Sequence, residues 1–394
     1  MRLFVIFFAL AFIAIAAGCS EQTTSPPPPA LRNAAASLFQ PESSIGRKPH
    51  TALKTLFSFN GADGNQPHAG LTLVNSKLYG TTYNGGAHDK GTVFEMGAFG
   101  KERVVYSFNG ADGEKPWAEL TPVNGKLYGT TVGGGANDMG TVFELGTLGG
   151  ERVVHSFNGA DGLYPYSGLT VVNGELYGTT NSGGAHGMGN VFELDLSSGK
   201  ERVVHSFNGA DGAFPFAGLT AVNDKLYGTT ASGGANEKGT IFELGAFGGE
   251  RVVYSFSGAD GRRPYAGLTL VNDKLYGTTT YGGAHDKGTV FEVDLSSGGE
   301  RVVYSFNGAD GERPYAGPTL VNNKLYGTTG GGGANEKGSV FELGAFGGER
   351  VVYSFNGADG RGPVGRLTLV NGNLYSTTQR GGANDKGAVF ELTP

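Results

Sequence analysis

The chain has 394 residues with a formal net charge of −6, and 71 of its residues are glycine. This glycine content lacks the every-third spacing of collagen, and 17 tyrosines with 25 phenylalanines are too many aromatic residues for a disordered chain. An acidic chain without a basic face also gives no reason to expect a nucleic-acid partner. Composition therefore indicates a globular protein with enough aromatic residues to build a core.

The first nineteen residues differ in character from the rest of the chain. Met1 and Arg2 precede fifteen apolar residues (3–17), a run too short to span a bilayer comfortably and typical of a secretory signal. The letters "AAGC" resemble a bacterial lipobox, although Ala16 stands where leucine is commonest, and Cys19 is the only cysteine. We expect residues 1–19 to be a lipoprotein signal ending at a lipidated Cys19; an ordinary signal peptide is the alternative.

Residues 20–50 are polar and rich in proline, with four consecutive prolines at Pro26 to Pro29. Proline-rich segments adopt semi-rigid polyproline conformations and act as spacers. We expect this stretch to be a flexible tether between the lipid anchor and the folded domain.

From about residue 51 onward the chain repeats one pattern. The aspartates of a "GADG" motif recur every 49 or 50 residues, which is in the range of kelch-like propeller blades. Each unit holds four runs of β-type residues, which in the first unit are 71–74, 77–82, 91–96 and 102–108. Asn-rich dipeptides join the first and second runs, and short glycine-rich loops join the third and fourth, as in antiparallel hairpins.

The order of the runs predicts a closed ring. Residues 52–59 match the fourth run of the other units, while the chain ends just after a third run at 388–392. If the first segment pairs beside the last, the seventh sheet is completed and no edge strand is left. We therefore predict an all-β fold for residues 51–394: a seven-bladed β-propeller of four-stranded antiparallel blades, closed by its N-terminal strand.

The shared motifs "GADG", "LYGTT", "GGA" and "GTVFEL" closely resemble the GloVer tandem repeat of choice-of-anchor bacterial surface proteins, across about 340 residues. The resemblance implies an exported, anchored repeat protein located in the cell envelope. It carries no activity over to this chain. The anchor here would be the lipid on Cys19.

Two glycine-rich loops of each unit should rise on one face of the propeller, where a constant scaffold with variable tips suits recognition. An exposed surface under weak constraint is the alternative. The "GADG" aspartates would cap turns by accepting backbone hydrogen bonds, and they are our candidate ligand-binding residues. Calcium at these positions is an alternative to a metal-free site. The candidates are Asp63, Asp112, Asp161, Asp211, Asp260, Asp310 and Asp359.

Other polar residues predict no catalytic or metal site. His88, His186 and His285 belong to alternate units and would lie too far apart to share a zinc ion. Packing or solvent exposure accounts for His155 and His205, and packing accounts for the single Trp117. The innermost runs contain no ionisable residue, which argues against catalysis in the channel. They do contain a ring of threonines at 72, 121, 170, 220, 269, 319 and 368.

We therefore expect a monomeric, lipid-anchored extracytoplasmic module without a cofactor, which binds a glycan or a protein through its glycine-rich loop face. Repeated weak contacts would add up by avidity. Two alternatives remain: a carbohydrate-active hydrolase or lyase with its site at the mouth of the channel, and a purely structural surface protein.

Overall fold

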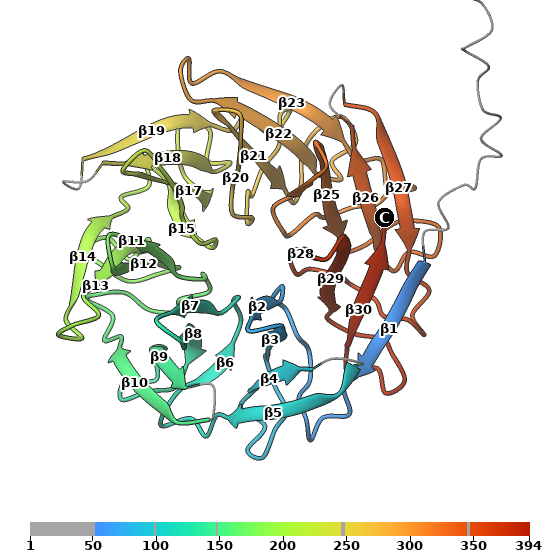
Figure 1. Ribbon diagram of the computed structural model, residues 1–394. Coiled ribbons are helices and arrows are strands. Elements are labelled where there is room, and N and C mark those ends of the chain that lie inside the picture. Colours follow the sequence, from blue (N-terminus) through green and yellow to red (C-terminus); the bar gives the residue numbers. More distant parts are fainter. Residues whose placement is uncertain (1–51, 98–99, 147–148, 246–248, 345–346) are drawn as a thin grey trace, which may run out of the picture. The chain divides into compact units, whose positions relative to one another are not determined.

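Short antiparallel strands account for nearly all regular structure in the computed structural model (Figure 1), which describes residues 52–97, 100–146, 149–245, 249–344 and 347–394. These residues belong to one compact unit, Pro49–Pro394. The expected signal peptide, Cys19 and the tether lie outside the described residues. Within the described ranges, no helix has the length and apolar character needed to cross a membrane.

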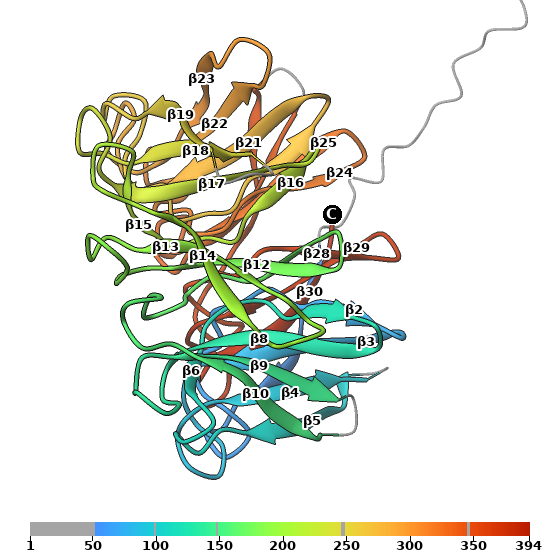
Figure 2. The ribbon, with the colours of Figure 1, turned by 90° about the vertical axis from the view of Figure 1, so that its left-hand side faces the viewer.

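Seven separate antiparallel sheets form the blades of a ring. Figure 1 looks along the axis of the ring, with the shortest strand of each blade innermost, and Figure 2 shows the blades edge-on. The prediction of a seven-bladed, all-β propeller is therefore confirmed. Valine, threonine and aromatic residues dominate the strands, as expected where both faces of a sheet are covered.

The first four blades, each from the axis outward, are β2 (Thr72–Val74), β3 (Lys77–Thr82), β4 (Thr92–Met96) and β5 (Glu102–Ser107) in blade 1; β7 (Thr121–Val123), β8 (Lys126–Gly133), β9 (Thr141–Gly146) and β10 (Glu151–Ser156) in blade 2; β11 (Thr170–Val172), β12 (Glu175–Thr180), β13 (Asn190–Leu194) and β14 (Glu201–Ser206) in blade 3; and β16 (Thr220–Val222), β17 (Lys225–Ser232), β18 (Thr240–Leu244) and β19 (Glu250–Ser255) in blade 4.

The remaining three blades are β20 (Thr269–Val271), β21 (Lys274–Thr279), β22 (Thr289–Asp294) and β23 (Glu300–Ser305) in blade 5; β24 (Thr319–Val321), β25 (Lys324–Thr329), β26 (Ser339–Leu343) and β27 (Glu349–Ser354) in blade 6; and β28 (Thr368–Val370), β29 (Asn373–Thr378), β30 (Ala388–Thr393) and β1 (Ala52–Ser58) in blade 7. Two further short strands, β6 (Glu114–Pro116) and β15 (Ala213–Pro215), pair with β8 and β17.

The first and last strands of the ring lie side by side. Strand β1 pairs antiparallel with β30, from Ala52 opposite Thr393 to Ser58 opposite Ala388. The blue and red ends of the coloured chain meet at this sheet in Figure 1. Closure by the N-terminal strand is confirmed, and it removes the sheet edges that a linear array would leave open.

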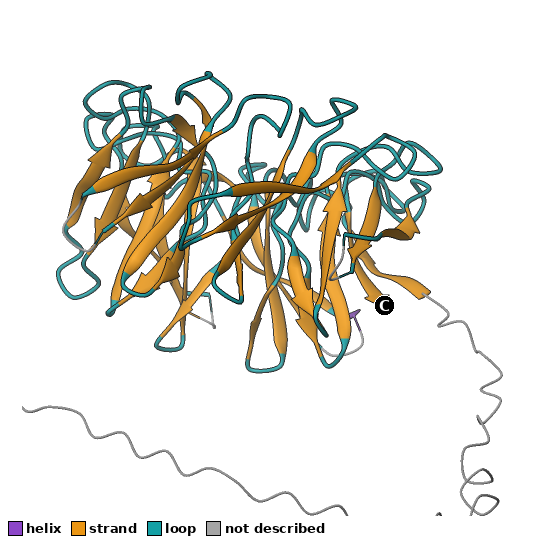
Figure 3. Ribbon diagram, turned by 90° about the horizontal axis from the view of Figure 1, so that it is seen from above, coloured by secondary structure: helices purple, strands orange, loops and turns teal. Residues whose placement is uncertain are grey.

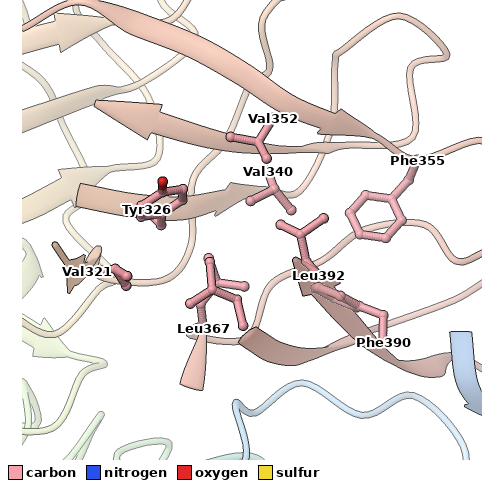
Figure 4. Close-up of a cluster of buried hydrophobic side chains, with 9 residues drawn as sticks. Val321, Tyr326, Val340, Val352, Phe355, Leu367, Phe390 and Leu392 are labelled. Carbon is pink, nitrogen blue, oxygen red and sulfur yellow. The ribbon is translucent and has the colours of Figure 1, made fainter. Parts of the chain in front are cut away.

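Phenylalanine pairs between neighbouring blades form the core. Phe59 follows β1 in blade 7 and meets Phe94 of blade 1 edge-to-face, with ring centroids 5.0 Å apart, and both are fully buried. The same pair recurs at every blade junction. Figure 4 shows one such junction, where Phe355 of blade 6 and Phe390 of blade 7 lie among buried aliphatic residues.

A close approach between a phenylalanine ring and the backbone explains the glycine of "LYGTT" in blade 1. A Cβ at Gly80 would lie 2.5 Å from the ring of Phe94. Such contact is impossible for a real side chain, so glycine lets the phenylalanine lie flat against the neighbouring strand.

The predicted threonine ring closes the propeller around its axis. Each innermost threonine donates its hydroxyl to a backbone carbonyl of the next blade, over 2.5–2.8 Å. The series ends with Thr368 of blade 7 donating to Leu71, which precedes the first strand of blade 1. These threonines therefore hold adjacent blades together.

The long loops gather on one face, as Figure 3 shows, with short hairpins on the other. The two glycine-rich loops of a blade pair with each other: in blade 1, Asn65 and Asn84 exchange backbone hydrogen bonds of 2.8 and 3.0 Å. Gly85, at φ +83°, makes this possible, because a Cβ there would lie 2.5 Å from the carbonyl oxygen of Gly61. The prediction that these loops share a face is confirmed.

Candidate functional site

A cavity of about 570 Å³ lies at the axis of the propeller, where the chain enters each innermost strand. Its wall is built from the segment "P-x-A-G-L-T" of the repeats, which joins the outermost strand of one blade to the innermost strand of the next. The residue after each proline faces this cavity, so seven equivalent positions converge there.

Six of these seven positions carry a ring side chain, in blades 1 to 6, and together we name them the aromatic arc: His68, Trp117, Tyr166, Phe216, Tyr265 and Tyr315. Neighbouring members are in contact. His68 stacks on Trp117 with ring centroids 3.7 Å apart, and Tyr166 stacks on Phe216 at 4.4 Å. Trp117 and Tyr166 meet edge-to-face at 5.4 Å.

The arc is interrupted at blade 7, where Val364 replaces the aromatic residue. Except for the buried His68, members of the arc are partly exposed. They therefore present apolar ring surface to the cavity. Trp117 packs, as the sequence predicted, but it also lines the cavity, a role that its slot in the repeat did not reveal.

Two charged side chains break the sevenfold repetition inside the cavity. Blades 1, 3, 4, 5 and 6 have glycine immediately before the "LT" or "PT" of the inner strand, whereas blade 2 has Glu119 and blade 7 has Arg366. The innermost strands contain no ionisable residue, as the sequence indicated. The cavity does contain such residues, because the connecting segment before each inner strand also lines it.

Glu119 lies against the backbone of blade 1. A Cβ at Gly70 would be 2.2 Å from its Oε1, so glycine at this position leaves room for the carboxyl group. Burial raises the pKa of Glu119, while the charge of Arg366 and a hydrogen bond from the Gly70 backbone act in the opposite direction. A carboxyl with a raised pKa in a cavity is suited to hydrogen bonding or to proton transfer.

Arg366 reaches across the cavity from blade 7. Its Nη2 donates to Oγ1 of Thr269 in blade 5 at 3.0 Å and to the carbonyl oxygen of Pro318 in blade 6 at 3.5 Å. This guanidinium is held by neutral acceptors, so much of its charge is available to an anionic or hydroxylated ligand.

His68 is neutral at the edge of the arc. Burial, together with the nearby charge of Arg380, lowers the pKa of His68 to about 3. Its ring lies 3.2 Å from the amide nitrogen of Gln379, another residue that lines the cavity. A neutral imidazole stacked on Trp117 adds flat surface to the arc without adding charge.

The seven "GADG" aspartates lie at the blade junctions, and none of them lines the cavity. In each, Oδ1 accepts the backbone N–H of the residue three positions earlier at 2.8–3.0 Å, the turn contact that was expected. In four, Oδ2 also accepts a hydrogen bond from a tyrosine of the preceding strand, and in two it lies 3.0–3.1 Å from Nε2 of a histidine there. Their assignment as ligand-binding residues remains a prediction.

The remaining sequence candidates lie apart from the cavity. His88, His186 and His285 are exposed on separate loops. Six of the seven third-strand glutamates form the cross-strand ion pairs that were expected, as Glu95 does with Arg103 at 3.1 Å, while Glu391 accepts hydrogen bonds from Asn373 and Tyr375. Burial raises the pKa of Glu95, but hydrogen bonds from Arg103, Lys77 and Tyr79 outweigh it and hold the pKa at about 2.

Solved structures resemble the propeller in fold. An oligogalacturonate lyase in complex with manganese matches with a TM-score of 0.55 at 13% identity, over 86% of this chain and 92% of the lyase. A putative 6-phosphogluconolactonase from Bacteroides uniformis matches with a TM-score of 0.51 at 13% identity, over 71% of this chain and 82% of that one. At this identity the likeness concerns the fold alone.

The search of curated proteins returned no match. The family model of the Gloeobacter/Verrucomicrobia repeat matches residues 44–242 and 221–394, which together include every blade. The repeat identified from "GADG", "LYGTT" and "GTVFEL" is the repeat of this family. The chain therefore belongs to the Gloeobacter/Verrucomicrobia repeat family.

Proposed function

We propose that this protein is a binding module that takes a carbohydrate in its axial cavity. The observation that carries the proposal is the aromatic arc, a row of ring side chains around one cavity. The C–H faces of sugar rings are apolar and weakly positive, so they pack on the negative faces of aromatic rings. Glu119, Arg366 and Gln379 supply the few polar groups that orient a ligand in such a cavity.

The single Trp117 provides a direct test, because it stands in the arc and is the only tryptophan of the chain. The protein is titrated with a panel of neutral and uronate-containing oligosaccharides while tryptophan emission is recorded. We expect a saturable change with at least one of them. Replacing Tyr166 and Phe216 by valine should weaken that binding at least tenfold, since two stacking surfaces are lost.

The chain contains its own controls for this experiment. Val364 occupies the equivalent position in blade 7, so valine is compatible with the fold at this slot. Phe214→Ala removes an aromatic residue that is 40% exposed on the loop face and does not line the cavity. Equal affinity in the Tyr166→Val/Phe216→Val and wild-type proteins, or no binding across the panel, would contradict the proposal.

Ligand binding at the "GADG" loops is a separate proposal with its own variant. Asp63 has no tyrosine or histidine partner, because Phe57 occupies that position of β1. Asp63→Ala should therefore disturb the blade little. Loss of binding in Asp63→Ala, with the arc variants unchanged, would place the ligand at the rim of the loop face instead of the cavity.

A second candidate function is a carbohydrate-active hydrolase or lyase, and the presence of Glu119 and Arg366 favours it. One carboxyl group with a raised pKa and one cation in the same cavity are parts that proton transfer at a sugar ring can use. Release of reducing ends or of unsaturated products, abolished by Glu119→Gln, would support an enzyme. Binding without turnover would support the module.

We further propose that the protein is anchored to the cell envelope through a lipid on Cys19. The apolar run 3–17 and the letters "AAGC" support this proposal. Cys19→Ser should prevent incorporation of labelled palmitate and move the protein from the membrane fraction to the soluble fraction of the envelope. Unchanged membrane association of Cys19→Ser, still without label, would mean that another segment anchors the chain.

A further inference from the structure

The outer rim of the propeller repeats a polar cluster at its blade junctions. At the junction of blades 1 and 2, Tyr106 donates its hydroxyl to Asp112 at 2.5 Å and lies 3.4 Å from a carboxylate oxygen of Glu151. The aspartate belongs to "GADG", and the glutamate begins the outermost strand of the next blade. Tyrosine is also the first member of this cluster at Tyr254 and Tyr304, whereas among the described residues the Tyr353 hydroxyl bonds only to Asp359, because β1 has Leu53 at the position of the glutamate.

Two consecutive junctions carry histidine instead of tyrosine. His155 Nε2 lies 3.1 Å from Oδ2 of Asp161 between blades 2 and 3, and His205 Nε2 lies 3.0 Å from Oδ2 of Asp211 between blades 3 and 4. The glutamates of these junctions are Glu201 and Glu250. In each group of three, one ligand atom per residue lies within 4.8 Å of the other two, and no other such group occurs among the described residues.

Both groups also contain an acceptor whose hydrogen-bonding capacity is unmet. Oε1 of Glu201 and Oε1 of Glu250 are buried and accept no hydrogen bond from the described residues, and the same is true of Oε1 in the equivalent Glu102, Glu151, Glu300 and Glu349. The aspartate side chains beside them are only 11% and 10% exposed. A buried carboxylate oxygen without a partner is costly, and a cation can satisfy it where an imidazole nitrogen completes the ligand set, as it does only in these two groups among the described residues.

We propose that His155, Asp161 and Glu201 form one zinc-binding site, and that His205, Asp211 and Glu250 form a second. One imidazole nitrogen and two carboxylate oxygens are a ligand set that Zn²⁺ accepts, with water in the fourth position. Tetrahedral bonds of about 2.1 Å place ligand atoms about 3.4 Å apart. The His–Asp separations are already close to this value, so the glutamate has the largest movement to make.

The tyrosine junctions explain why the proposal is confined to two sites. A neutral phenol is a poor ligand for zinc, whereas an imidazole nitrogen that carries no proton is a good one. Each ion would join the outer strand of one blade to that of the next. Zinc would therefore tie blades 2, 3 and 4 together at the rim, far from the cavity and independent of the function proposed for it.

The experiment measures zinc stoichiometry and thermal stability on the full, tag-free chain after treatment with EDTA. We expect two Zn²⁺ per chain, a higher Tm with ZnCl₂, and a smaller effect of CaCl₂, because calcium prefers six to eight oxygen ligands. His155→Tyr and His205→Tyr should each retain one ion, and the double variant none. These variants reproduce the residue of the tyrosine junctions, so the fold should tolerate them.

The double variant Glu201→Gln/Glu250→Gln is a second test of zinc binding, and it keeps both histidines. It should lower zinc affinity at least tenfold while leaving the Tm without metal unchanged or higher. The proposal is overturned if the wild-type chain binds no zinc, or if the double tyrosine variant still binds two ions. Should the tyrosine variants fail to fold, unchanged zinc affinity in the double glutamine variant would overturn it equally.

Discussion

Individual carboxyl groups at the tyrosine junctions contribute to the response of this protein to pH. Burial, and after it the charge of Asp112, raise the pKa of Glu151 to about 7. Glu349 is raised to the same value by burial and by Asp310. In the unfolded chain such glutamates titrate near 4.5. The folded protein therefore holds these protons more tightly than the unfolded chain does.

The sign of the stability change follows from this difference. The folded state binds more protons between about pH 4.5 and 7, so the free energy of unfolding falls as pH rises through this window and then levels off. Replacing Glu151, Glu300 and Glu349 by glutamine should raise the Tm at pH 8, where wild-type carboxylates repel their aspartates, and leave it unchanged at pH 5. Circular dichroism melts from pH 5 to pH 8 measure both. If the Tm of both proteins changed with pH in the same way, the pKa values of these three glutamates would be ordinary.

At the level of elements, β1 is the strand on which closure depends. It covers the edge of β30 along the whole register from Ala52 to Ser58. Removing residues 52–58 should lower the Tm sharply and promote self-association, because the backbone groups of β30 and apolar surface of blade 7 become exposed. Thermal melts and size-exclusion chromatography report these effects.

A permuted chain is the matched control for this deletion. It begins at Asn60 and carries residues 52–59 after Pro394, joined by "GAFGG", the loop that connects the third and fourth strands in blade 4. This chain rebuilds blade 7 in the order of the other blades and should recover most of the lost stability. If the permuted chain is no more stable than the deletion, pairing of β1 with β30 does not account for closure.

At the level of whole molecules, the ring is nearly symmetric and the cavity is not. Glu119→Gly/Arg366→Gly would place glycine before the inner strand of every blade, as five blades already have it. We expect the variant to fold, with carbohydrate binding at least tenfold weaker because the polar contacts are lost while the arc remains. Trp117 emission measures the affinity. Unchanged affinity would mean that stacking on the arc is sufficient for binding.

Much of the fold was predictable from the chain. The 49- or 50-residue spacing of Asp63, Asp112 and their equivalents, the four β-type runs, and the match of residues 52–59 to a fourth run together led to seven closed blades. The reason is that propeller blades are local. The four main strands of a blade pair in sequence order, except β1 with β30, and only the short β6 and β15 pair with a strand one further along, so pairing follows from repetition and turn residues.

The site was less accessible to sequence reasoning. Alignment of the repeats shows Glu119 and Arg366 in place of glycine, and this was the available signal. Both residues lie in connecting segments outside the inner strands. A sequence does not state which residues of a connecting loop turn toward the axis, so their place in the cavity was not predicted. His155 and His205 were likewise interpreted singly as packing residues, since their partners Glu201 and Glu250 lie about one repeat further along the chain.

The sequence by itself therefore determined the repeat, the strands, the number of blades and the closing strand, because these depend on short-range pattern and periodicity. Only the tertiary structure decided that six ring side chains, one carboxyl and one guanidinium meet at the axis, and that His–Asp–Glu groups assemble at the rim. Those groups come from different blades, and their meeting depends on how the ring closes, a property that no single repeat contains.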